Sequence, residues 1–161
     1  MTLSVGDRLP QATFSTMTAE GPAPMTTADV FAGRKVVAFA LPGAFTPTCH
    51  AKHVPGFLAR ADDFRAKGVD CIACISVNDV FVMDAWARTL KAGNRILFLA
   101  DGNAEFTKAA GLDYDASKFG MGVRSKRYAM IVEDGVVTAL EIETARGEAT
   151  VSGGEHMLGL L

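Results

Sequence analysis

The stretch "LPGAFTPTCH", residues 41–50, places a cysteine three positions after a threonine, just beyond an apolar run. Thr46 is a favoured residue at the N-cap of a helix, and Pro47 then falls at the first helical position, where its missing N–H costs nothing. Cys49 lands in the first turn, beside unpaired backbone N–H groups and the positive end of the helix macrodipole, which stabilise a thiolate. This position indicates a nucleophilic thiol, although a cysteine that only packs in the core fits it equally well.

Two further cysteines form "CIAC", residues 71–74, which is formally a C-x-x-C motif. The motif lies within an apolar run typical of a buried strand, where residues three apart point to opposite faces and lie about 10 Å apart. A disulfide requires Cα atoms within about 7 Å. We therefore expect Cys71 to fill space in the sheet and not to pair with Cys74.

His50 and His53 follow Cys49 on the same expected helix, and with Cys74 they suggest a metal site. Zinc sites, however, use four well-spaced ligands, or three ligands and a water, and no second C-x-x-C or H-x-x-x-H motif is present. The glycines of residues 119–125 lack GxGxxG spacing and do not join a strand to a helix. We therefore expect no metal, no nucleotide and no other cofactor.

The elements that would position Cys49 alternate between strands and helices. Continuous apolar runs predict buried strands over residues 35–41, 69–77 and 95–101. Helical spacing and capping signals predict helices over residues 47–67, 78–93, 103–111 and 153–161. Asp134-Gly135 between two apolar runs predicts a hairpin over 127–143, and residues 1–34 are interpreted as loops with one strand at 12–16. This order predicts an α/β fold, a thioredoxin-like three-layer α/β/α sandwich with a central mixed sheet.

Composition sets bounds on the size and surroundings of the protein. With 161 residues, of which 49% are apolar and 21% charged, the chain suits a single domain over residues 1–161. A net charge of −2 gives no electrostatic reason to expect nucleic acid or a membrane as partner. No run approaches the ~18 apolar residues of a membrane helix, and the N-terminus lacks a secretory-signal pattern. Three cysteines do not suggest a disulfide-built secreted scaffold, so we expect a cytoplasmic protein.

The segment around Cys49 resembles the peroxiredoxin active-site pattern Pro-x-x-x-Thr-x-x-Cys through Pro42, Thr46 and Cys49. Its extended form, "LPGAFTPTCHAKHVPGF", is similar to the type II, or Prx5-like, peroxiredoxins of the AhpC/TSA superfamily. The resemblance continues through residues 74–86, 98–101 and 126–137, so it covers most of the chain in the same order. We therefore expect the thioredoxin-like fold of that family.

The resemblance implies a thiol peroxidase that reduces hydrogen peroxide and alkyl hydroperoxides. According to this resemblance, Cys49 would attack the O–O bond and become a sulfenic acid, and Thr46 would hydrogen-bond the peroxide and the thiolate. Pro42 would shield the thiolate from water, and the family's arginine falls on Arg127. The chemistry needs a thiolate and donors directed at the charge that develops on oxygen, which a guanidinium supplies at every working pH. From the residues alone, Arg124 is an equal candidate for that donor.

The resemblance also bears on how Cys49 would be recycled. Cys74 follows Cys49 by 25 residues, the spacing of a second cysteine in plant-like and many bacterial type II enzymes, which makes it a candidate resolving cysteine. The C-terminal cysteine of the animal enzymes is absent from residues 148–157. An external thiol is then the implied reductant, either glutathione with glutaredoxin or thioredoxin, and a homodimer is the implied assembly. The alternative is a peroxide-sensing module of the same fold that passes oxidation from Cys49 to a partner protein.

Overall fold

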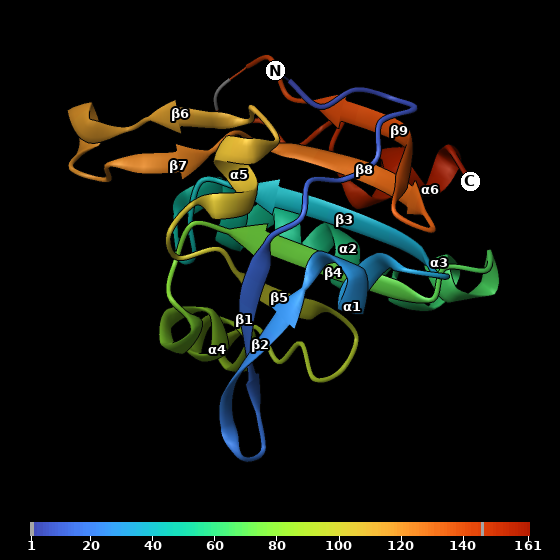
Figure 1. Cartoon of the computed structure of the whole chain (residues 1–161), viewed down its shortest axis with the longest axis horizontal. Coiled ribbons are helices and arrows are strands. Elements are labelled where there is room, and N and C mark those ends of the chain that lie inside the picture. The colour runs from blue at the N-terminus through green and yellow to red at the C-terminus, as the bar shows by residue number, and fades with distance from the viewer. Residues whose placement is uncertain (1, 146) are drawn as a thin grey trace.

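The computed structural model of the protein describes residues 2–145 and 147–161. Within them, seven strands form one mixed sheet: β1 (Thr13–Thr18), β2 (Gly21–Thr26), β3 (Lys35–Leu41), β4 (Cys71–Ser76), β5 (Leu97–Ala100), β8 (Tyr128–Glu133) and β9 (Val136–Ile142). Their order across the sheet is β2-β1-β5-β4-β3-β8-β9, which can be followed in Figure 1. β3, β4 and β5 are parallel, and β1 and β8 pair with them antiparallel at the two sides.

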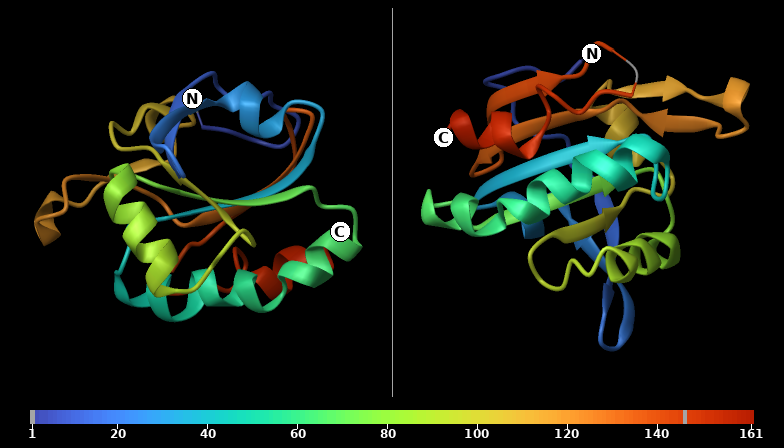
Figure 2. Two further views of the ribbon diagram at one scale, coloured as in Figure 1. Left: turned by 90° about the horizontal axis from the view of Figure 1, so that it is seen from below. Right: turned by 180° about the vertical axis from the view of Figure 1, so that it is seen from behind.

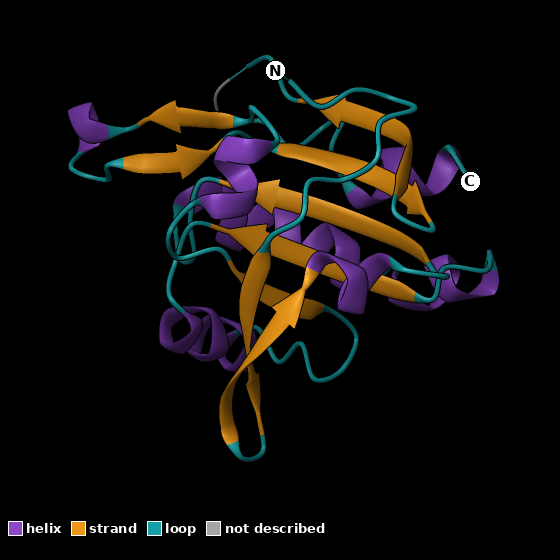
Figure 3. Ribbon diagram, in the orientation of Figure 1, coloured by secondary structure: helices purple, strands orange, loops and turns teal. Residues whose placement is uncertain are grey.

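Helices cover both faces of this sheet, as Figure 2 (left) and Figure 3 show. One face carries the helices α1 (Thr27–Phe31) and α5 (Glu105–Ala109). The other carries α2 (Val54–Ala59), α3 (Ala61–Ala66), α4 (Val80–Thr89) and α6 (Gly154–Gly159). Each face buries its own apolar cluster, so the predicted three-layer α/β/α sandwich with a central mixed sheet is confirmed. None of the described helices is long and apolar enough to cross a membrane.

The buried strands and the closing hairpin lie where the sequence predicts them. All but the first residue of β3 are buried, as expected for a strand covered on both faces. Asp134 and Gly135, which join β8 to β9, have φ values of 49° and 78°. Positive φ at both central positions is the geometry of the tight hairpin turn that the Asp-Gly pair predicts.

The expectation of loops with one strand over residues 1–34 is wrong, because β1 continues into a second strand and a helix. β2 contains Pro22 and Pro24, which argue against a strand by their missing N–H groups. Because β2 is an edge strand of the sheet, those positions do not need to donate. α1 follows with a capping box, in which Thr26 Oγ1 accepts from Asp29 N at 3.1 Å and Asp29 Oδ2 accepts from Thr26 N at 2.8 Å.

A second difference is the small hairpin of β6 (Asp113–Asp115) and β7 (Val123–Ser125), which the sequence does not predict. It carries a short 3-10 helix, Ser117–Phe119, at its tip and projects beside the sheet at the left of Figure 1. Three-residue strands are too short to show the alternation that marks a strand in sequence.

The helix expected over residues 47–67 is present but not continuous. It starts at Pro47, passes through a π-helical turn, η1 (Cys49–His53), and is interrupted at Arg60 between α2 and α3. In the π-helical turn the N–H of Val54 donates to the carbonyl of Cys49, five residues back. Pro55 has no N–H to continue regular bonding, and π-turns occur next to such disruptions and at functional sites.

Candidate active site

Cys49 lies immediately beyond the carboxyl end of β3, in the first turn of the helix that follows the loop 42–46. The carbonyl of Thr46 accepts the N–H of His50 at 2.9 Å, so the backbone of Thr46 occupies the predicted N-cap position. Its hydroxyl, however, donates to the carbonyl of Gly43 at 2.7 Å and does not cap the helix. Cys49 has no exposed surface, and its thiol lies in the apolar cluster between the sheet and α2.

Arg127, the residue before β8, brings a guanidinium to the Cys49 thiol. Its Nη2 donates to Cys49 Sγ at 3.1 Å, and its Nη1 donates to His53 Nδ1 at 2.9 Å. The two arms of one guanidinium therefore hold the thiol and the imidazole of a single helical turn. Such an arrangement stabilises negative charge on the sulfur and on an atom bound beside it.

His53 is buried, and its neighbours determine which nitrogen carries the proton. Because Nδ1 accepts from Arg127, Nε2 carries the hydrogen and donates to the carbonyl of Ser152 at 2.9 Å. Burial, together with the Arg127 charge, lowers the pKa of His53 to about 3, although the bond to Ser152 acts in the opposite direction. His53 is thus neutral, and it orients Arg127 without competing with it for negative charge.

Ser152 is itself fixed by a carboxylate from the end of β9. Glu143 Oε2 accepts from the backbone N of Ser152 at 2.8 Å and from its hydroxyl at 2.5 Å. A continuous series of hydrogen bonds therefore runs from Glu143 through Ser152, His53 and Arg127 to Cys49.

Arg124, the other candidate arginine, lies against the loop and not on the thiol. Its Nη1 donates to the Pro42 carbonyl at 3.3 Å and its Nε donates to the carbonyl of Met121 at 2.9 Å. A Cβ on Gly43 would come within 2.8 Å of the Arg124 guanidinium, so the loop passes close to it. In the same loop, the backbone N–H of Ala44 donates to Asn78 Oδ1 at 2.9 Å.

The other two cysteines lie in opposite layers, as the strand geometry predicts. Cys74 is fully buried in the same apolar cluster as Cys49, whereas Cys71 packs against the cluster of the other face. Burial raises the pKa of the Cys74 thiol well above its usual range; the nearby Cys49 adds to this rise and Arg127 opposes it. All three cysteines, each within the described residues, are free thiols.

The histidines flanking Cys49 are engaged by other groups. His50 Nδ1 accepts from Trp86 Nε1 at 3.0 Å, and both ring nitrogens of His53 are bonded as described above. No group of three His, Cys, Asp or Glu side chains in the described part of the chain could hold a metal ion.

Sequence reasoning missed the supporting residues of this site. From sequence, His53 is considered only as a metal ligand. Its position four residues after Cys49 nevertheless places the side chains of Cys49 and His53 on one side of the helical turn. Ser152 and Glu143 lie about a hundred residues further along the chain, in segments with no local signal for a site.

Comparison with known proteins gives a consistent result. The profile of the Redoxin family matches residues 4–158. The chain is 52% identical to peroxiredoxin-2E-2, chloroplastic, of Oryza sativa over 99% of this chain and 73% of that protein. It is 47% identical to peroxiredoxin-2E, chloroplastic, of Arabidopsis thaliana over 99% and 69% of the two chains.

A solved structure agrees over nearly the whole length. The reduced Prx3 of Vibrio vulnificus in complex with H2O2 superimposes with a TM-score of 0.94 at 50% identity, covering 99% of each chain. This similarity confirms the predicted thioredoxin-like fold, and relatives named as enzymes do not favour the peroxide-sensing alternative. The chain therefore belongs to the peroxiredoxins of the AhpC/TSA superfamily, and its activity is that of a thiol-dependent peroxidase.

Proposed function

We propose that Cys49 is the peroxidatic cysteine and that Arg127 supplies the donor that stabilises its reaction. The observation that carries this assignment is the 3.1 Å contact between Arg127 Nη2 and the buried Cys49 Sγ. The thiolate attacks one peroxide oxygen and the O–O bond breaks. The departing oxygen takes a proton and leaves as water or an alcohol, while Cys49 is oxidised to a sulfenic acid. Because Cys49 has no exposed surface, the peroxide reaches Sγ only after a small displacement of the groups around it.

Thr46 and Pro42 act from the loop that precedes the helix. The Thr46 hydroxyl donates its proton to the Gly43 carbonyl at 2.7 Å, and we propose that the lone pairs of Oγ1 accept the O–H of the bound peroxide. Pro42 is half-buried and shields the thiolate from water, and the Arg124 contact to its carbonyl fixes its position. The substrates that we propose are hydrogen peroxide and alkyl hydroperoxides. The Prx3 of Vibrio vulnificus, which was solved in complex with H2O2, supports the first of these.

An external thiol, either glutathione with glutaredoxin or thioredoxin, is the reductant that we propose for the sulfenic acid. Cys74 shares a core cluster with Cys49 and is the candidate for an intramolecular alternative. Its burial and raised pKa disfavour the thiolate that would have to attack Cys49. Both features support the external route.

We further propose a homodimer and a cytoplasmic location. Phe45 and Phe81 are 48% and 65% exposed, and they lie on the loop before η1 and in the first turn of α4. These two segments are joined by the bond from Ala44 N to Asn78 Oδ1, so the apolar surface is concentrated beside the active-site helix. Three free thiols suit a reducing compartment. Sedimentation of wild type and Phe81→Ser, and cell fractionation, are the respective tests.

The assignment of residues is tested by peroxide turnover with each reductant in turn. Cys49→Ser should abolish turnover, while Cys71→Ser should leave it unchanged and serves as the matched control. Arg127→Ala should reduce the rate with peroxide far more than Arg124→Ala. Full activity of Cys49→Ser would refute the mechanism. If Cys74→Ser loses turnover with thioredoxin but reacts normally with the first peroxide, Cys74 and not the external thiol resolves the sulfenic acid.

A further inference from the structure

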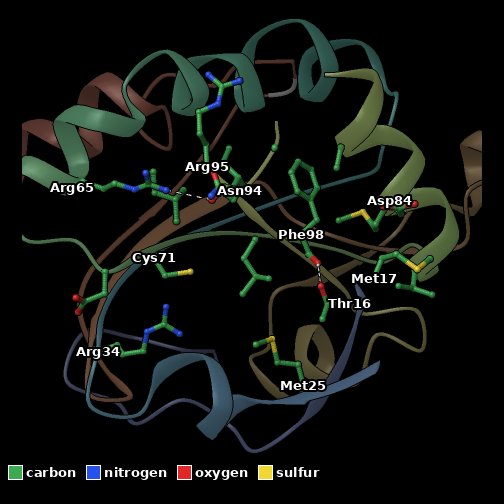
Figure 4. Close-up of a pocket in the computed structure, with 18 residues that line it drawn as sticks. Thr16, Met17, Met25, Arg34, Arg65, Cys71, Asp84, Asn94, Arg95 and Phe98 are labelled. Carbon is green, nitrogen blue, oxygen red and sulfur yellow. Dashed lines mark hydrogen bonds between the residues drawn. The ribbon is translucent and has the colours of Figure 1, made fainter. Parts of the chain in front are cut away.

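A cavity of about 460 Å³ lies at the end of the sheet opposite Cys49, where β4 and β5 begin. It is bounded by α3 and α4 on one side and by the β1–β2 hairpin on the other, as Figure 4 shows. It exists because β1 pairs with β5 only at Ser15 and Ala100, so the hairpin diverges from the first half of β5. Its volume is within the range of small-molecule sites. The lining begins at Cys71, at the start of β4, and reaches Phe98, which pairs with Cys74 in the sheet.

Much of the lining is apolar and adaptable. Three methionines, one each from β1, β2 and α4, line it together with Ile72 and Phe98: Met17, Met25 and Met83. Unbranched thioether side chains adjust to ligands of different shape, which is why methionine is frequent at permissive binding surfaces. These side chains would accommodate a hydrophobic body.

Arg34 and Arg65 bring two guanidinium groups to the end of the cavity near Cys71, and Figure 4 shows them on either side of that cysteine. Burial raises the pKa of the Cys71 thiol; the charges of Arg34 and Arg65 and a hydrogen bond from Arg34 oppose that rise, whereas Asp70 adds to it. Arg34 Nη1 donates to the carbonyl of Val30 at 3.2 Å, and Arg65 Nη2 donates to that of Asn94 at 3.3 Å.

Neither guanidinium has an anionic partner among the described residues. The two carboxylates of the lining are already engaged, since Asp84 pairs with Arg88 at 2.7 Å and Asp70 accepts the backbone N of Lys35 at 2.8 Å. A third arginine of the lining, Arg95, donates to the carbonyls of Lys91 at 2.7 Å and of Ala92 at 3.3 Å. Three arginines against two aspartates leave the lining with a net positive charge, and guanidiniums bind planar anionic oxygens strongly.

We propose that this cavity binds a small amphipathic organic anion, with its anionic group on Arg34 and Arg65 and its hydrophobic body against the methionines. None of the residues assigned to the peroxidase site lines this cavity. Of the other two cysteines, Cys71 borders the cavity and Cys74 does not. A guanidinium–anion hydrogen bond typically corresponds to about tenfold in affinity, so removing both arginines should weaken binding about 100-fold.

The test uses the intact protein and two fluorescent probes that share a hydrophobic body. Anilinonaphthalene sulfonate carries an anionic group, and phenylnaphthylamine is its neutral counterpart. We expect saturable binding of one sulfonate probe per chain, with about 100-fold loss in Arg34→Gln/Arg65→Gln. The control, Arg8→Gln/Arg60→Gln, removes the same net charge elsewhere and should bind normally. All variants should retain peroxide turnover, which verifies that they are folded.

Alkylation of wild-type protein locates the probe without any substitution. The sulfonate probe should slow the reaction of Cys71 with iodoacetamide, followed by peptide mass spectrometry, and should leave Cys49 labelling unchanged. Protection of Cys49 in place of Cys71 would overturn the proposal. Equal affinity of the arginine variant and the control, equal binding of the neutral probe, or binding without saturation would overturn it as well.

Discussion

Replacing His53 with Phe should slow the reaction of Cys49 with hydrogen peroxide while leaving the protein folded. Phe keeps an aromatic ring in the cluster, where the ring centroid of His53 lies 5.0 Å from that of Phe39 and 5.8 Å from that of Phe57. It removes the Nδ1 acceptor that holds one arm of Arg127 at 2.9 Å. The other arm, which donates to Cys49, would then be free to rotate away from the sulfur.

The size of the effect follows from what is lost and what remains. A hydrogen bond to a charged group is worth about 1.5–3 kcal/mol, and about 1.4 kcal/mol corresponds to a tenfold change in rate. His53→Phe removes the orientation of Arg127 but not its charge, so we expect the lower end, about tenfold. Arg127→Ala removes the donor itself and should cost about 100-fold or more, as for other donors to a developing oxyanion.

His53→Gln separates positioning from simple packing. A carboxamide offers one acceptor for Arg127 and one donor for the Ser152 carbonyl, the same pair of functions as the neutral imidazole. Its rate should lie between those of wild type and His53→Phe, although it fills the aromatic cluster less well. Stopped-flow fluorescence of Trp86, the single tryptophan, which donates to His50 at 3.0 Å, reports the reaction. The control is His156→Phe on α6. A normal rate for His53→Phe, or a slower rate for His53→Gln than for His53→Phe, would refute the positioning role.

Three further predictions concern stability. Because the pKa of His53 is lowered to about 3 when folded, against about 6.5 when unfolded, the unfolded state binds the extra proton between these values. The free energy of unfolding, from denaturant titration, should therefore fall by about 2–3 kcal/mol between pH 6.5 and pH 4.5, and His53→Phe should show a fall that is smaller by that amount. Tyr128→Phe should raise the melting temperature, because the buried Tyr128 hydroxyl has no hydrogen-bond partner among the described residues and its desolvation costs about 1–3 kcal/mol. Gly154→Ala should destabilise the protein by about 1–3 kcal/mol, because its Cβ would lie 2.6 Å from the backbone carbonyl of Gly56; an unchanged denaturation midpoint would show that α6 does not pack as described.

The central part of the fold is predictable because burial on both faces leaves a strong trace in sequence. β3 and the start of β8 are continuous apolar runs, and the Asp134-Gly135 turn specifies its own geometry. β2 escaped prediction because its prolines are tolerated only at an edge, and its place at the edge depends on the whole sheet. The interruption of the long helix at Arg60 leaves no comparable signal.

The site is predictable to the extent that its groups are local in sequence. The place of Cys49 in the first helical turn follows from Thr46 and Pro47 alone, whereas the choice between Arg124 and Arg127 does not. Both arginines lie in the segment before β8, and only the exact start of that strand decides which one faces the thiol. The structure places Arg127 there, in agreement with the family resemblance, and directs Arg124 to the Pro42 carbonyl.

Because His53 donates to the Ser152 carbonyl, the active site is fully assembled only in molecules whose C-terminal segment is folded in place. α6 has six residues, too few to be stable as an isolated helix, so it stays in place through its contacts with α2. Local opening of such an element is a separate, low-energy transition that does not require global unfolding. Molecules in which this segment has opened retain Cys49, Arg127 and His53 but lose the Ser152 carbonyl that fixes the imidazole bound to Arg127. Solution conditions or partners that change the population of this opened state would thereby change the peroxidase rate without touching any residue that contacts the peroxide.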